Sequence, residues 1–186
     1  MRPMRFWRSA IGFASLLCLG AAAHAQLKNE NLLVALPQGF KVGFTDSVNG
    51  MHMQEMVPAN ETVVDWTEMV TVQIFLNRKD IDPMQFLATM EKQWAGACKG
   101  STATPAVAGK SNGYTSVMRL FRCPLLASSG KPETTMMKAI KGNDSFYLVQ
   151  RAFRGVPTPA QLEQTKAYID GVSVCDTRLP AHPCKM

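Results

Sequence analysis

The sequence predicts an α+β fold, in which an antiparallel β-sheet built from two blocks of strands carries two packed helices. Residues 32–76 and 114–153 are rich in apolar and polar residues that alternate with period two, which is typical of strands. Each block is followed by a segment that opens with a proline-containing helix start, Asp82-Pro83 in the first case and Thr158-Pro159 in the second. Strand blocks that are separated by helices are typical of an α+β fold, and here the helices could lie on opposite faces of the sheet.

The first block reads as an antiparallel meander. A short strand over Leu32–Leu36 precedes a half-buried strand in which Phe40, Val42 and Phe44 share one face. Asn49-Gly50 predicts a tight hairpin turn, after which a return strand covers residues 51–57. A long strand then covers residues 67–76, with Val70, Val72, Ile74 and Leu76 on one face.

The first helix begins at Asp82, which can cap the free amide groups of the first turn, with Pro83 at the first helical position and Gln85 at the capping-box position. It ends near Cys98. Its apolar residues follow the spacing of one helical face, which we expect to pack on the sheet: Phe86, Leu87, Met90, Trp94 and Ala97.

The second block begins with a strand over Tyr114–Cys123 that we expect to end at Pro124. A flexible turn over residues 128–132 leads to a hairpin of two strands, residues 133–140 and 145–153. Thr158 and Gln161 form the capping box of the last helix. The residues expected to face inward on that helix are Leu162, Thr165, Lys166 through its aliphatic stem, and Ile169. Val172 and Val174 extend a terminal strand or tail.

The first 25 residues predict export. Arg2, Arg5 and Arg8 precede an apolar run over residues 11–22, and Ala23-His24-Ala25 has the small-x-small pattern that signal peptidases cleave. The run is too short for a permanent membrane span. We therefore expect residues 1–25 to be a signal peptide cleaved after Ala25, and residues 26–186 to form a single periplasmic domain without a transmembrane segment.

Charge and cysteine content agree with that compartment. The predicted signal carries three of the 20 basic residues and none of the 14 acidic ones, which leaves a formal charge of +3 spread along the chain. A scattered charge of this size argues against nucleic acid as a partner. Cys98, Cys123, Cys175 and Cys184 predict two disulfides with three possible pairings, of which we favour the sequence-local closures Cys98–Cys123 and Cys175–Cys184.

No motif for a cofactor or a catalytic nucleophile occurs in the sequence. Met51, His52 and Met53 offer the thioether and imidazole groups that suit copper, although alternation along a strand would point the two methionines away from the histidine. A copper- or small-ligand-binding protein therefore stays as an alternative. A second alternative is an enzyme whose polar site forms around Asp65 and Glu68, with His52 and Glu55 in neighbouring strands.

Basic side chains of the second block could form a shallow docking surface, with Arg151 and Arg154 as its test residues. The wider set is Arg119, Arg122, Lys138, Lys141, Arg151 and Arg154. The simpler interpretation is a solvated sheet edge that its charges protect from pairing.

The order of elements resembles the PsbP-like α/β/α sandwich. The residues that carry the resemblance are Leu36-Pro37-Gln38-Gly39-Phe40 before the meander and Trp66-Thr67-Glu68 at the start of the long strand. Cys123-Pro124 and the tail from Cys175-Asp176-Thr177-Arg178 to Cys184 further resemble a group of small uncharacterised exported proteins of Gram-negative bacteria. The resemblance implies an accessory or binding role through docking on partners, and it carries no catalytic residues.

We therefore expect a non-enzymatic periplasmic protein without a cofactor, which binds a protein or another component of the cell envelope through its sheet edge or loops.

Overall fold

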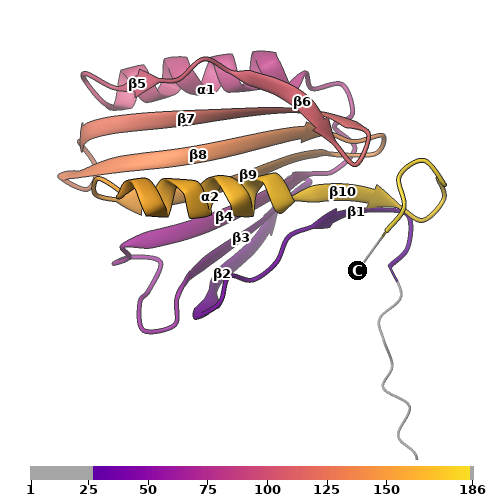
Figure 1. Cartoon of the computed structure of the whole chain (residues 1–186), viewed down its shortest axis with the longest axis horizontal. Helices are drawn as coiled ribbons and strands as arrows, with labels where there is room; N and C mark the ends of the chain where they lie inside the picture. The colour runs from indigo at the N-terminus through magenta and orange to yellow at the C-terminus, as the bar shows by residue number, and fades with distance from the viewer. Residues whose placement is uncertain (1–26, 185–186) are drawn as a thin grey trace, which may run out of the picture.

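A computed structural model describes residues 27–184, and the predicted signal peptide lies outside this range. The chain forms an eight-stranded antiparallel sheet, a separate two-stranded sheet and two helices (Figure 1). The elements in chain order are β1 (Glu30–Leu33), β2 (Phe40–Val48), β3 (Met51–Pro58), β4 (Glu68–Phe75), α1 (Pro83–Ala97), β5 (Thr102–Ala103), β6 (Val107–Ser111), β7 (Tyr114–Leu126), β8 (Lys131–Lys141), β9 (Phe146–Arg154), α2 (Pro159–Gly171) and β10 (Ser173–Asp176). The predicted α+β class is confirmed.

The large sheet joins the two predicted strand blocks. Its order is β2-β3-β4-β9-β8-β7-β5, and β6 also pairs with β7. The meander and the β8–β9 hairpin are confirmed, and the two blocks meet where β4 pairs with β9. The β2–β3 turn at Asn49-Gly50 is confirmed too, since both residues adopt the positive φ angles that such a tight turn requires.

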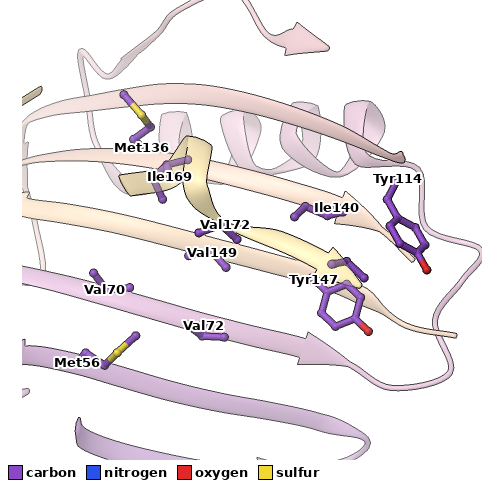
Figure 2. Close-up of a cluster of buried hydrophobic side chains, with 11 residues drawn as sticks. Met56, Val70, Val72, Tyr114, Met136, Ile140, Tyr147, Val149, Ile169 and Val172 are labelled. Atoms are coloured by element: carbon purple, nitrogen blue, oxygen red, sulfur yellow. The ribbon is translucent and has the colours of Figure 1, made fainter. Parts of the chain in front are cut away.

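The helices cover opposite faces of this sheet, which gives the sandwich architecture. Leu87 of α1 is fully buried against Phe121, Phe146 and Leu148. On the other face, Ile169 of α2 packs among apolar side chains of β4, β8 and β9 (Figure 2). Both predicted N-caps form, because Asp82 accepts the amide of Gln85 and Thr158 accepts that of Gln161.

Several local predictions were wrong. The strand from Tyr114 continues beyond Pro124 to Leu126, because an irregularity after Cys123 removes Pro124 from the pairing. The first strand begins at Glu30 and pairs with β10 instead of with the meander. The short strands β5 and β6 were not predicted. Lys166 is exposed and pairs with Asp170, so its stem does not face the core.

The strand β2 also differs from its prediction. A bulge leaves Gly43 unpaired between Val42, opposite Met56, and Phe44, opposite Glu55. One extra residue reverses the alternation beyond it, so Val42 and Phe44 lie on opposite faces instead of sharing one. The strand is exposed from Lys41 to Val48, and is therefore not half-buried.

Candidate functional site

An open cleft lies on the sheet face that carries α2. The helix contacts chiefly β8 and β9, so it leaves part of the same face of β2, β3 and β4 uncovered, although Met56 and Val70 on that face are buried. The pairing of β1 with β10, the strand that follows α2, fixes the position of β1. The chain from β1 to residue 34 therefore passes over this uncovered part. The space between has a volume of about 290 Å³ and is open to solvent.

The lining of the cleft is apolar on one side and polar on the other. The apolar side chains come from the β1 segment and from β4: Leu32, Val34, Val72 and Ile74. The polar ones come from the β2–β3 hairpin: Thr45, Ser47, His52 and Gln54, with Asp46 and Met53 beside them. Cross-strand pairing explains this grouping, because Ser47 lies opposite His52 and Thr45 opposite Gln54. The Ser47 hydroxyl and His52 Nδ1 are hydrogen-bonded at 2.5 Å.

Sequence reasoning did not identify this cleft. Alternation places Thr45 and Ser47 on one face of a strand, and His52 and Gln54 on one face of the next. The Asn49-Gly50 turn fixes the register that brings the two pairs together. The missing information was the path of β1, which forms one wall of the cleft and depends on a partner strand at least 140 residues away in the chain.

The structure does not gather the three residues considered for copper. Met51 lies opposite Phe75 and Met53 opposite Gln73, whereas His52 lies opposite Ile74 on the other face of the sheet. The thioether sulfur of Met51 accepts a hydrogen bond from the amide of Gln73 at 3.5 Å. The two sulfur ligands and the imidazole therefore point to different faces.

Arg151 and Arg154 also lie on opposite faces of the sheet and do not form one surface. Arg151 is paired with Glu68 and stacks on Tyr168 of α2. Arg154 lies over the ring of Trp66, 4.2 Å from its centroid, and donates a hydrogen bond to the carbonyl oxygen of Val64. Each guanidinium is thus held by partners within the chain.

The carboxylates considered for an enzymatic site do not converge either. Glu68 is occupied by Arg151, and its side chain is only 18% exposed. Asp65 is 87% exposed and lies 3.6 Å from the ammonium group of Lys131. Burial raises the pKa of Glu55, whose side chain lies on the face opposite His52.

Lys138 is the basic residue whose role sequence reasoning missed. It is 6% exposed, and its ammonium group donates to three carbonyl oxygens at the end of α2, those of Ile169, Asp170 and Val172. Burial lowers its pKa. Lys138 therefore anchors the C-terminal end of the helix and belongs to no exposed basic surface.

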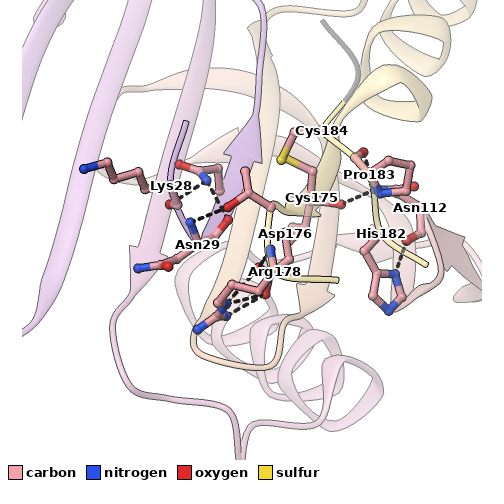
Figure 3. The surroundings of a disulfide bond; sticks show 12 residues. Lys28, Asn29, Asn112, Cys175, Asp176, Arg178, His182, Pro183 and Cys184 are labelled. Carbon is pink, nitrogen blue, oxygen red and sulfur yellow. Dashed lines mark hydrogen bonds and ion pairs between the residues drawn. A yellow bond between two sulfur atoms is a disulfide. The ribbon is translucent and has the colours of Figure 1, made fainter. Parts of the chain in front are cut away.

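A polar junction joins the two-stranded sheet to the rest of the molecule. The carboxylate of Glu30 accepts the amide groups of residues 143–145 and the hydroxyl of Tyr147. Arg178 bridges Asp144 and Asp176. Its hydrogen bonds to Asp176 lower the pKa of that carboxyl group (Figure 3). Although oxygen atoms of Glu30, Asp144 and Asp176 lie within 4.8 Å of one another, amides and a guanidinium already occupy them.

The structure forms the two sequence-local disulfides. The sulfur atoms of Cys98 and Cys123 are bonded at 2.03 Å, and this disulfide connects the end of α1 to β7. Cys175 and Cys184 are joined at 2.05 Å, and this bond closes the loop after β10 (Figure 3). Inside that loop, His182 stacks on Tyr114 and shares a hydrogen bond with the carbonyl oxygen of Asn112.

Comparisons with known proteins show likeness at the level of solved structures. No protein-family model and no curated protein matches the chain. LpqN, which is involved in cell envelope biogenesis of Mycobacterium tuberculosis, is 12% identical with a TM-score of 0.46, covering 81% of this chain and 87% of LpqN. The Saccharomyces cerevisiae Ran-binding protein Mog1p is 10% identical with a TM-score of 0.44, covering 84% of this chain and 87% of Mog1p.

A third similar structure comes from the family whose architecture the sequence resembles. Cyanobacterial PsbP from Synechocystis sp. PCC 6803 is 12% identical with a TM-score of 0.43, covering 85% of this chain and 98% of that protein. Because these likenesses are distant, the function must be argued from the residues of this chain.

Proposed function

We propose that the protein is an exported, non-enzymatic accessory protein that binds an extended segment of a protein partner along the edge strand β2. The observation that carries this proposal is the contrast between the two edges of the large sheet. The outer side of β7 is paired with β5 and β6, whereas no described strand pairs with the outer side of β2. A free edge presents unpaired backbone groups on which another strand can dock.

The side chains of β2 suit such docking. Val42, Phe44 and Val48 are 47%, 39% and 49% exposed, so they offer apolar surface to a docked segment. Proteins that must keep an edge unpaired commonly place bulges and charges on it. Here the bulge is confined to Gly43, and the segment from Phe44 to Val48 contains a single charged residue, Asp46. This regular half of the strand is therefore the expected docking segment.

Other features support the remaining parts of the proposal. The two disulfides are typical of proteins that fold in an oxidising compartment, and the predicted signal peptide suggests the periplasm as that compartment. Within residues 27–184, no helix is long and apolar enough to cross a membrane. Asp65 and Glu68, around which an enzymatic site was considered, are both paired with basic side chains, which favours binding over an enzymatic reaction.

Site-specific photo-crosslinking in exporting cells tests the proposal. The photoreactive residue is placed at Val42, on the edge strand, or at Val107, which is 59% exposed on β6 at the opposite edge. We expect a discrete adduct from position 42 and none of the same mass from position 107. Mass spectrometry of the adduct then identifies the crosslinked segment.

A charge-blocked variant provides the matched control. Phe44→Lys with Val48→Lys adds two positive charges to the docking segment without touching the core, and should abolish the adduct from position 42. Val107→Lys should leave that adduct unchanged. No adduct from position 42, or an adduct that survives the double substitution, would show that β2 is not the docking edge.

A further inference from the structure

We infer that the cleft between β1 and strands β2–β4 binds a small, uncharged aliphatic molecule with a hydroxyl or amide head group. This inference is independent of partner docking on β2. Four aliphatic residues line the cleft, Leu32 and Val34 from the β1 segment and Val72 and Ile74 from β4. Such a wall accommodates an aliphatic chain and offers no aromatic ring for stacking.

The polar side of the cleft selects the head group. Thr45, Ser47, His52 and Gln54 offer hydroxyl, imidazole and amide groups that both donate and accept hydrogen bonds. Among the described residues that line the cleft there is no lysine and no arginine. The side chain of Asp46 points to the other face of the sheet, because it alternates along β2 with Thr45 and Ser47. A carboxylate or phosphate head would therefore find no basic side chain in the lining to pair with.

The volume of the cleft limits the size of the ligand. A water molecule occupies about 30 Å³ in the liquid, so a space of about 290 Å³ holds roughly ten non-hydrogen atoms. A single chain of about eight carbons with one polar group fits this limit. Because the cleft is open to solvent and neither helix contributes to its lining, such a molecule can enter without movement of either helix.

Methyl NMR of the folded, disulfide-bonded protein tests the inference with 1-octanol as the probe. We expect saturable chemical-shift changes in the methyl groups of Leu32, Val34, Val72 and Ile74. The control methyl groups are those of Leu125 and Val156, which are 61% and 87% exposed and lie outside the cleft. Octanoate has the same chain length but a charged head, and at pH 8 it should bind at least tenfold more weakly.

Two variants sharpen the test. Ser47→Ala removes a hydroxyl from the polar side and should weaken octanol binding several-fold, as expected for the loss of one hydrogen bond. Val107→Ala, on β6 at the opposite edge of the sheet, should leave the affinity for octanol unchanged. Absent or non-saturable shifts, or equal shifts at Leu125 and Val156, would overturn the inference. Equal affinity for octanoate would overturn the assignment of an uncharged head group.

Discussion

At the scale of single residues, buried polar groups hold the structure together at positions where the sequence suggested exposed charge. Lys138 lies in a strand with apolar neighbours on both sides, so its position in the sequence gives no sign that its ammonium group ends against the last turn of α2. Arg151 likewise lies within a strand and finds its carboxylate, Glu68, more than 80 residues away. Pairings of this kind depend on the tertiary structure, which alternation alone does not reveal.

The role of Lys138 predicts a large effect of its removal. Lys138→Met keeps much of the aliphatic stem but leaves the carbonyl oxygens of Ile169 and Asp170 without their buried donor. We expect the free energy of unfolding to fall by about 2–4 kcal/mol, measured by urea denaturation. The matched control is Lys166→Met on α2, whose exposed ion pair with Asp170 should contribute little to stability. Equal effects of the two substitutions would contradict the anchoring role.

Asp176 predicts a loss of stability in acid. Hydrogen bonds from Arg178 lower the pKa of Asp176 in the folded protein. In the unfolded chain, the pKa of an aspartate has its ordinary value of about 3.9. The unfolded state therefore takes up a proton first as pH falls. The stabilisation is complete above that unfolded value and is lost as pH falls through the lower folded value.

Asp176→Asn should reduce stability at pH 7 and flatten its decline between pH 5 and pH 3, as measured by urea denaturation across that range. Asp80→Asn is the control, because a backbone hydrogen bond and the Arg78 guanidinium also lower the pKa of Asp80 but the pair is exposed to solvent. An acid transition that Asp176→Asn leaves unchanged would assign the loss of stability to other carboxylates.

At the scale of elements, local signals predicted the helices and hairpins, whereas the edges of the sheet depended on longer-range pairing. Asp82 and Thr158 cap their helices as expected, because capping needs only neighbours within one turn. The bulge at Gly43 could not be predicted from local sequence, because it depends on tertiary contacts. Val57 and Val63 pack where a β-carbon at position 43 would lie, so the position favours glycine. Sequence alternation across positions 40–44 is regular, and the bulge reverses it.

The two disulfides stabilise different elements and should differ in their contributions. Cys98–Cys123 closes a loop with a sequence separation of 25, and Cys175–Cys184 one with a separation of 9. Loop-closure entropy predicts about 3.5 kcal/mol for the longer loop and about 2.6 kcal/mol for the shorter. Paired Cys→Ser variants, compared by urea denaturation, should show this order. The opposite order would indicate that the tail loop contributes native contacts beyond closure.

At the scale of the whole molecule, the chain ends build the candidate cleft. The β1–β10 pair joins residues near the beginning of the described chain to residues near its end, and the β1 segment then forms one wall of the cleft. The apolar character of residues 32–36 predicted a strand there but could not give its partner. The polar residues of the cleft were visible in the sequence, whereas the site itself depended on this distant pairing.

Glu30 is expected to hold that arrangement in place. Its carboxylate accepts the backbone amides of Asn143 and Ser145 and the hydroxyl of Tyr147, all from the β8–β9 hairpin. Glu30→Ala removes the acceptor while leaving β1 able to pair with β10. We expect faster hydrogen exchange of the amides at residues 143–145 and a loss of about 2–3 kcal/mol in the free energy of unfolding.

The same substitution links the junction to the cleft. If Glu30 holds β1 against the large sheet, Glu30→Ala should broaden or shift the methyl signals of Leu32 and Val34, which form the β1 wall, more than those of Val72 on β4. Glu91→Ala is the control, because it breaks the pair with Arg119 on the opposite face of the sheet. If the signals of Leu32 and Val34 are the same in Glu30→Ala as in Glu91→Ala, the β1 side of the cleft is held in place by the pairing of β1 with β10 and does not need Glu30.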